Sequence, residues 1–110
     1  MSSDKAYGTS PTLPYKEEFP LNGLDIYSSS KACEDIIARA YAYNYNLPIT
    51  VIRSCNIFGE YDFNWSRVIP QFIKAYLENK KIVIYKNTSG QLREYIYIKD
   101  LVKALTLLIS

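Results

Sequence analysis

A tyrosine and a lysine four residues apart, Tyr27 and Lys31, are the residues of this sequence best suited to chemistry. Side chains at positions i and i+4 of a helix lie on one face, with about 5–6 Å between their Cβ atoms. A free tyrosine has a pKa of about 10, too high for a base at neutral pH. An ammonium about 4 Å away stabilises a phenolate by about 4 kcal/mol, enough to bring such a pKa near neutrality. The pair can therefore transfer a proton, although this spacing also arises by chance on helices.

The composition of the 110-residue chain excludes several other chemistries. A net charge of +2 gives no electrostatic case for binding nucleic acid or an anionic membrane. Without histidine there is no His-based metal site and no Ser-His or Cys-His nucleophile, and we expect no metal. Cys33 and Cys55 are too few for a disulfide framework, and no apolar run approaches the roughly 20 residues of a membrane span. The sequence thus predicts a cytoplasmic protein with neither a nucleic-acid nor a membrane partner.

The Tyr27/Lys31 pair falls in the first turns of a predicted helix over residues 26–45. Asp25 is suited to cap its beginning, and Asn46 to end it in a left-handed conformation. Apolar side chains recur at three- and four-residue spacing on one face of this helix, which we expect to face a core. The stripe comprises Cys33, Ile36, Ile37, Ala40 and Tyr41.

Helices and strands alternate along the rest of the chain, which indicates an α/β fold. We expect strands at 49–53, 82–85 and 95–98, a loop at 54–65, a turn at 87–90, and helices at 66–79 and 101–109 capped by Ser66 and Asp100. The strand at 49–53 is apolar on both faces, which is typical of the interior of a parallel sheet. Because the chain offers too few partner strands for such a sheet, we expect it to be a fragment of a longer protein.

A second motif, one loop before Tyr27, reads Ser2-Ser3-Asp4-Lys5-Ala6-Tyr7-Gly8. With both motifs in this order, the sequence resembles the extended short-chain dehydrogenase/reductase family, the NAD-dependent nucleotide-sugar epimerases and dehydratases. In that family, a strand end carrying S-[ST]-x-x-x-Y-G is followed by Y-x-x-x-K. The resemblance implies that Ser3, Tyr27 and Lys31 form a catalytic triad, and that Tyr27 and Lys31 also contact the cofactor NAD.

The two residues after Ser3 indicate which reaction of the family to expect. In its 4,6-dehydratases these positions hold an acid and a base, Asp-Glu in the dTDP-glucose type and Asp-Lys in the CDP-glucose type. Asp4 and Lys5 therefore resemble CDP-glucose 4,6-dehydratase most and are implied to be catalytic. Epimerases usually carry smaller, non-ionisable residues here. The alternative is a nucleotide-sugar 4-epimerase or related oxidoreductase, in which the two residues form only a surface ion pair worth under about 1 kcal/mol.

Three further segments extend the resemblance and imply a nucleotide-diphosphate sugar as substrate. Residues 53–59 are similar to R-x-x-N-x-[YF]-G, which implies that the backbone near Cys55 lies beside the nicotinamide and that Asn56 contacts the substrate. Arg67 begins a segment similar to the family's helix that enters the substrate half. Arg93 begins one similar to R-[DE]-[YW]-[ILV]-[YH]-[VI]-x-D and is implied to bind the diphosphate, a task suited to its planar guanidinium.

The family's Gly-rich dinucleotide turn has no counterpart, because the four glycines are far apart. The resemblance therefore implies an α/β chain holding the second half of a Rossmann-type parallel-sheet domain (1–60) and the start of a smaller substrate-binding domain (61–110). We expect the isolated chain to be inactive. The alternative to an enzyme is that the chain is a truncated product without catalytic function. By analogy only, a full-length parent would form a homodimer through the helix bearing Y-x-x-x-K.

Overall fold

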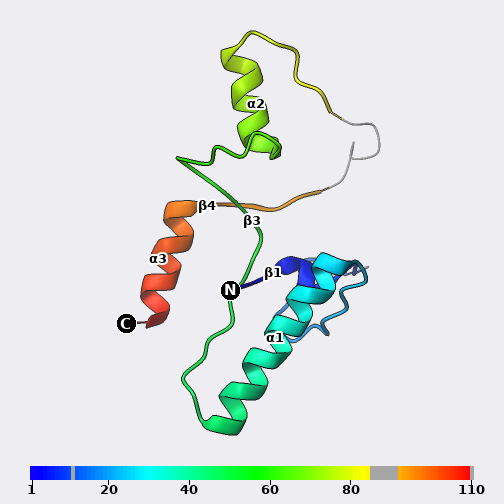
Figure 1. The fold of residues 1–110 in the computed structure, drawn as a ribbon, viewed down its shortest axis with the longest axis vertical. Helices are drawn as coiled ribbons and strands as arrows, with labels where there is room; N and C mark the ends of the chain where they lie inside the picture. The colour runs from blue at the N-terminus through cyan, green and yellow to red at the C-terminus, as the bar shows by residue number, and fades with distance from the viewer. Residues whose placement is uncertain (11, 85–91, 110) are drawn as a thin grey trace. The chain divides into compact units, whose positions relative to one another are not determined.

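A computed structural model describes residues 1–10, 12–84 and 92–109 of the chain. The chain divides into two compact units, Met1–Cys55 and Asn56–Ser110 (Figure 1). Each unit contains one two-stranded parallel sheet together with helices. The predicted α/β class is therefore confirmed.

The first unit is built around one long helix. Its elements are β1 (Ser2–Ser3), the 3-10 helix η1 (Asp4–Tyr7), α1 (Ile26–Tyr45) and β2 (Arg53–Ser54). β1 pairs in parallel with β2, so that Ser2 lies opposite Arg53 and Ser3 opposite Ser54. Both β1 and η1 pack against α1. Ala6, Tyr7 and Ala32 form the small apolar core of this packing.

The sequence predicts both ends of α1 correctly. Asp25 precedes the helix in an extended conformation and accepts hydrogen bonds from the backbone nitrogen (3.0 Å) and the hydroxyl (2.5 Å) of Ser28. These two bonds lower the pKa of the Asp25 carboxyl. Asn46 ends the helix with a left-handed φ of 51°, and its N–H donates to the carbonyl of Ala42.

The buried face of α1 differs from the predicted one. Ser28, Ala32 and Asp35 are its buried residues. Ile36 and Ile37 of the predicted stripe are instead about half exposed, at 51% and 56%. The small side chains at 28 and 32 let η1 and β1 approach the helix closely, so the apolar stripe points away from these elements.

The strand predicted at 49–53 is mostly absent, since only Arg53–Ser54 pairs. A strand is defined by its hydrogen bonds to a neighbouring strand. Because β1 is only two residues long, it pairs with only two residues, Arg53 and Ser54. The backbone nitrogen of Ser2 adds one bond to the carbonyl of Ile52, at 2.8 Å. The apolar residues before Ile52 have no paired neighbour within the described part of the chain.

The second unit contains β3 (Asn56–Phe58), α2 (Val68–Leu77), β4 (Tyr95–Tyr97) and α3 (Ile98–Ile109). β3 pairs in parallel with β4, with Asn56 opposite Tyr95 and Phe58 opposite Tyr97. Gly59 comes directly after β3 and packs closely against Ile98, the first residue of α3. A Cβ at this position would lie 2.3 Å from Cγ2 of Ile98, so the approach requires glycine.

Several predicted boundaries in this unit are wrong. β3 falls within the predicted loop, because β4 supplies it with a partner. Ser66 does not cap α2, since its hydroxyl donates to the side-chain oxygen of Asn64 at 2.6 Å. α3 begins at Ile98, which places Asp100 inside its first turn rather than at its cap. Residues 82–84 form no strand, and Tyr85 and the turn at 87–90 lie outside the described residues.

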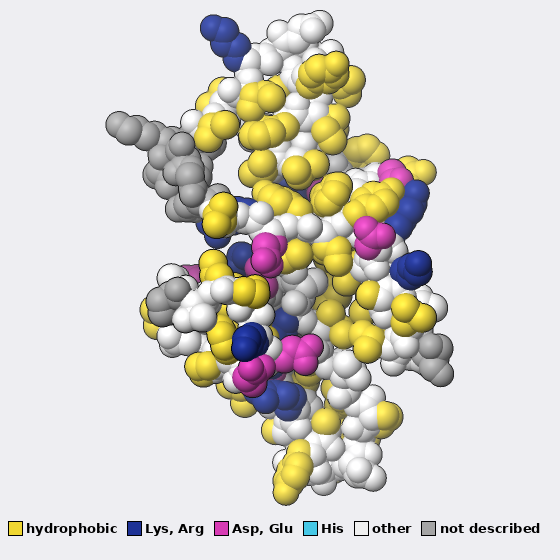
Figure 2. All heavy atoms as spheres, turned by 180° about the vertical axis from the view of Figure 1, so that it is seen from behind, with side chains coloured by type: hydrophobic (Ala, Val, Ile, Leu, Met, Phe, Trp, Pro, Cys, Tyr) yellow, Lys and Arg dark blue, Asp and Glu magenta, His cyan; other side chains and the backbone are white. Residues whose placement is uncertain are grey.

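Large apolar side chains are exposed in the second unit, and Figure 2 shows them gathered over α2 and α3. They include Ile73, Tyr76, Leu77, Val102, Leu108 and Ile109. Among the described helices, none is long and apolar enough to cross a membrane.

Candidate active site

Ser3, Asp4 and Lys5 form a continuous chain of polar contacts where β1 passes into η1. Ser3 caps η1, and its hydroxyl accepts from the backbone nitrogen of Lys5 at 3.2 Å. The same hydroxyl donates to Oδ1 of Asp4 at 3.0 Å, while Nζ of Lys5 lies 2.7 Å from Oδ2 of Asp4. A hydroxyl, a carboxylate and an ammonium are therefore held in contact by the local backbone.

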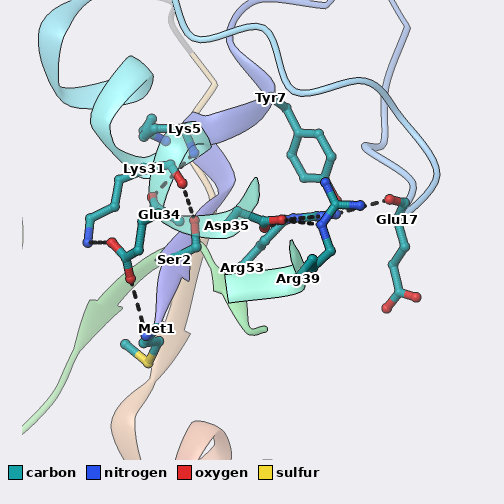
Figure 3. Close-up of polar contacts among 11 residues, drawn as sticks. Met1, Ser2, Lys5, Tyr7, Glu17, Lys31, Glu34, Asp35, Arg39 and Arg53 are labelled. Atoms are coloured by element: carbon teal, nitrogen blue, oxygen red, sulfur yellow. Dashed lines mark hydrogen bonds and ion pairs between the residues drawn. The ribbon is translucent and has the colours of Figure 1, made fainter. Parts of the chain in front are cut away.

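α1, the helix that carries Tyr27 and Lys31, is hydrogen-bonded to β1. The hydroxyl of Ser2, the neighbour of Ser3, donates to the backbone carbonyl of Lys31 at 3.0 Å (Figure 3). Tyr27 lies one turn earlier on α1, and 56% of its surface is exposed. The packing of β1 and η1 on α1 thus joins the three elements that carry the five predicted catalytic residues.

Lys31 has a partner that the sequence analysis missed. Its ammonium lies 2.6 Å from a carboxylate oxygen of Glu34, and the other oxygen of Glu34 lies 3.4 Å from the amino group of Met1. The hydrogen bond that its ammonium donates to Glu34 is the main cause that raises the pKa of Lys31, and Tyr27 contributes a smaller electrostatic effect. The ammonium therefore stays charged at neutral pH, as the stabilisation of a phenolate requires.

A buried carboxylate, also missed, lies one turn beyond Lys31. Asp35 has no exposed surface, and Figure 3 shows it between two arginines. Nε and Nη2 of Arg53 lie 2.6 and 3.2 Å from its two oxygens, and Nε of Arg39 lies 2.8 Å from Oδ1. Arg53 also donates from Nη1 to the hydroxyl of Tyr7 (2.6 Å) and to the carbonyl of Glu17 (3.0 Å). The hydrogen bond from Arg53 is the main cause that lowers the pKa of Asp35.

The predicted cofactor and substrate residues beyond position 54 lie in both units. Cys55 ends the first unit and is half-buried. In the second unit, Nδ2 of Asn56 donates to the carbonyl of Glu94 at 2.9 Å, next to the exposed Arg93. Arg67 precedes α2, is exposed, and lies 3.2 Å from a carboxylate oxygen of Asp62. These two residues line a hollow of about 250 Å³.

Glu60, on the rim of the same hollow, also went unrecognised in the sequence. One of its carboxylate oxygens accepts from the hydroxyl of Tyr97 at 2.6 Å and from Nζ of Lys99 at 2.7 Å. The bond from Lys99, followed by that from Tyr97, lowers the pKa of Glu60 to about 2. Glu60 is therefore a fixed negative charge that joins the loop after β3 to the start of α3.

The chain belongs to the NAD dependent epimerase/dehydratase family, whose model matches residues 1–110. It is 34% identical to the dTDP-D-glucose 4,6-dehydratase of Bos taurus over 94% of its length, and 32% identical to the dTDP-glucose 4,6-dehydratase of Salmonella typhimurium. These alignments cover only 29% and 33% of those proteins. The chain therefore spans about a third of the length of its relatives.

Solved structures agree with this family. The dTDP-glucose 4,6-dehydratase of Bacillus anthracis, in complex with NAD, superposes with a TM-score of 0.86 at 36% identity over 97% of this chain and 34% of its own. The dTDP-glucose 4,6-dehydratase of Streptomyces venezuelae, also with NAD bound, gives a TM-score of 0.85 at 30% identity, covering 98% of this chain and 33% of its own. The chain thus has the parallel α/β architecture of the Rossmann-type dehydratases.

Asp35 makes the stability of the first unit depend on pH. Because its folded-state pKa is lowered, its contribution is complete above its ordinary pKa of about 4 and is lost as the pH falls through the folded value. We expect Asp35→Asn to lower the free energy of unfolding by about 3 kcal/mol at neutral pH, since it breaks a buried ion pair.

Urea unfolding at a series of pH values measures this effect. The free energies of unfolding of the wild type and of Asp35→Asn should converge as the pH falls. Glu18→Gln, at an exposed position of the same unit, is the control. Parallel curves for wild type and Asp35→Asn would contradict this assignment.

Proposed function

We propose that this chain supplies the proton-transfer half of the active site of an NAD-dependent nucleotide-sugar 4,6-dehydratase. The observation that carries the proposal is the contact chain of Ser3, Asp4 and Lys5, packed on the helix that bears Tyr27 and Lys31. The named relatives act on dTDP-glucose, as their names state. The Asp-Lys pair at 4 and 5 favours CDP-glucose, so the nucleotide stays a prediction. A cytoplasmic location likewise stays a prediction.

The residues present fit the nicotinamide end of NAD. Tyr27 is more than half exposed, and the side chain of Lys31 retains 26% exposure, so a ligand can reach both. We propose that they hold the nicotinamide ribose and that the backbone near Cys55 lies beside the nicotinamide. NAD, when bound, accepts a hydride from the sugar and later returns it. The sequence has no Gly-rich turn for the pyrophosphate, so we expect no turnover by residues 1–110 alone.

The oxidation step depends on Tyr27, Lys31 and Ser3. Tyr27, as a phenolate, accepts the proton of the sugar 4-hydroxyl while the hydride leaves C4. The charge of Lys31 stabilises the phenolate, and the hydroxyl of Ser3 orients the 4-hydroxyl. The ketone formed at C4 makes the neighbouring C5 proton acidic, which prepares the elimination.

The elimination depends on Asp4 and Lys5. The step requires Lys5 as a neutral amine and Asp4 as a neutral acid, the forms that result when one proton passes across their contact of 2.7 Å. The amine of Lys5 then removes the C5 proton, the bond between C6 and oxygen breaks, and Asp4 protonates the departing hydroxyl to give water. This step returns both residues to the ion pair seen in the structure. The ammonium of Lys5 would then protonate C5 as a hydride is returned to C6, which gives the 4-keto-6-deoxy sugar. The proton that Tyr27 took from the 4-hydroxyl would pass to Lys5 and restore both residues.

We propose that Asn56, Arg67 and Arg93 bind the nucleotide-diphosphate sugar from the second unit. Arg67 and Arg93 are exposed cations, which suits the recognition of phosphate. We also propose that residues 1–60 form the second half of the cofactor domain and residues 61–110 the start of the substrate-binding region, with Asn56 contacting the substrate from the end of the first part.

Lys5→Met tests the assignment in a preparation that has the complete NAD site. We expect dehydration to fall by about 10²–10⁴-fold, because the base for C5 is lost, while reduction of bound NAD by CDP-glucose or dTDP-glucose persists. The product is measured by the absorbance of the 4-keto-6-deoxy sugar in alkali. Lys16→Met, on the exposed loop, should leave both half-reactions unchanged. Equal loss of both half-reactions would contradict the role of Lys5, and formation of a galacto isomer by the wild type would identify an epimerase instead.

We further propose that the protein forms a homodimer through the outward face of α1. Ile36, Ile37 and Tyr41 are each more than half exposed on this face, an arrangement typical of helices that pack against a partner. The rings of Tyr41 and Tyr45 lie 5.4 Å apart between centroids and extend the surface toward the end of the helix.

Ile37→Glu tests the dimer. A charge at the centre of the apolar face should raise the dissociation constant by about tenfold or more, because the carboxylate loses water on association. Sedimentation velocity over a range of concentrations measures the shift. Leu13→Glu, at an exposed position of the loop before α1, should leave the dissociation constant within about twofold of the wild type. A monomeric wild-type protein, or equal effects of the two variants, would contradict the proposal.

A further inference from the structure

We propose that Asp35 and Arg53 are positioning residues for the reaction, because together they fix the helix turn of Tyr27 and Lys31 against the segment of Ser3, Asp4 and Lys5. We name this ion pair the Asp35/Arg53 clamp. The inference rests on the proposed function, in which those five residues carry out the proton transfers. Asp35 lies four residues after Lys31 and eight after Tyr27, so the three side chains follow one face of α1.

The clamp is one side of a closed triangle of contacts. Asp35 joins α1 to β2 through two hydrogen bonds from Arg53, at 2.6 and 3.2 Å. β2 is joined to β1 by the parallel register that sets Ser2 opposite Arg53. β1 is joined back to α1 by the bond of 3.0 Å from the Ser2 hydroxyl to the carbonyl of Lys31. Because all three sides are bonded, α1 cannot slide or rotate against β1 without breaking a buried contact.

Arg53 extends the same constraint to η1. Its Nη1 lies 2.6 Å from the hydroxyl of Tyr7, which ends the 3-10 turn that begins with Asp4 and Lys5. The ring of Tyr7 stacks on Tyr15 at 5.1 Å between centroids, and the same Nη1 donates to the carbonyl of Glu17. The guanidinium of Arg53 therefore contacts both α1, through Asp35, and η1, through Tyr7. A lysine has a single nitrogen and no planar fork, so it cannot make these contacts together.

Arg39 provides a contrast within the same cluster. It donates to Oδ1 of Asp35 at 2.8 Å, a distance between those of the two bonds from Arg53. However, it lies four residues along the same helix, and its side chain is 57% exposed. Arg39 therefore contributes charge to the carboxylate but joins no two elements. Comparison of the two arginines separates the electrostatic effect of the cluster from its geometric effect.

Arg53→Lys and Arg39→Lys are compared by NMR on the whole chain, without any ligand. The reporters are the Ser3 amide signal and the Tyr27 ring signal, the latter identified by its loss in Tyr27→Phe. In Arg53→Lys both signals should move or split beyond the wild-type line width, whereas in Arg39→Lys both should stay in place. A folded Arg53→Lys chain with both signals at the wild-type positions would overturn the proposal. If Arg53→Lys does not fold, Tyr7→Phe, which removes one contact of the guanidinium, should displace the Ser3 signal, and an unmoved signal overturns the proposal equally.

Kinetics give a second readout in the preparation with the complete NAD site. Misplaced reacting groups lower kcat, so Arg53→Lys should reduce kcat by about 10- to 100-fold with KM within about twofold. Arg39→Lys should leave both constants within about twofold. A raised KM with unchanged kcat in Arg53→Lys would contradict a positioning role. Absence of dehydration by the wild-type protein would overturn the proposed function, and the NMR comparison would still test the clamp.

Discussion

A carboxylate without any exposed surface, Asp35, imposes the strictest constraint on the first unit. Burial of a charge is costly unless it is paired and hydrogen-bonded, and Asp35 meets this condition with three bonds from Arg53 and Arg39. Two of these bonds come from another element of the unit. The position of α1 relative to β2 is therefore set by the need to satisfy this carboxylate.

The proposed chemistry depends on the fixed position of α1 relative to β1 and β2. The register of β1 on β2 places Ser2 beside Arg53, and Ser2 in turn holds the carbonyl of Lys31. The residues that follow Ser2 turn at once into η1, where backbone geometry alone brings the Ser3 hydroxyl, the Asp4 carboxylate and the Lys5 ammonium together. The proposed proton-transfer site, which contains no histidine, thus lies on β1, η1 and α1.

The sequence predicts those features of the fold that depend on short-range interactions. α1 has its predicted ends because Asp25 and Asn46 satisfy the terminal backbone groups locally. The family motifs predict a triad of Ser3, Tyr27 and Lys31, and the structure joins the elements that carry these residues, while their catalytic roles stay a prediction. The family, inferred from these motifs, and the α/β class, indicated by the alternation of helices and strands, are confirmed by the family match and the solved structures.

Features that depend on distant partners could not be predicted from the sequence. The pairing of Asp35 with Arg53 spans 18 residues, and nothing in the local sequence marks Asp35 as buried. The apolar periodicity of α1 predicts the wrong buried face, because small residues at 28 and 32 rather than large ones make the packing contact. The strand expected at 49–53 is reduced to Arg53–Ser54, because, among the residues that the structure describes, only these two have β1 as a neighbouring strand to pair with. β3 was not predicted because its pairing partner, β4, lies far along the sequence.

A double-mutant cycle on Asp35 and Arg53 tests the central claim most directly. The free energy of unfolding is measured for the wild type, Asp35→Asn, Arg53→Met and the double variant. The account predicts that the second substitution costs much less once the first is present, with a coupling free energy of about 2 kcal/mol. Additivity within about 0.5 kcal/mol would show that the two residues act independently and would contradict the account.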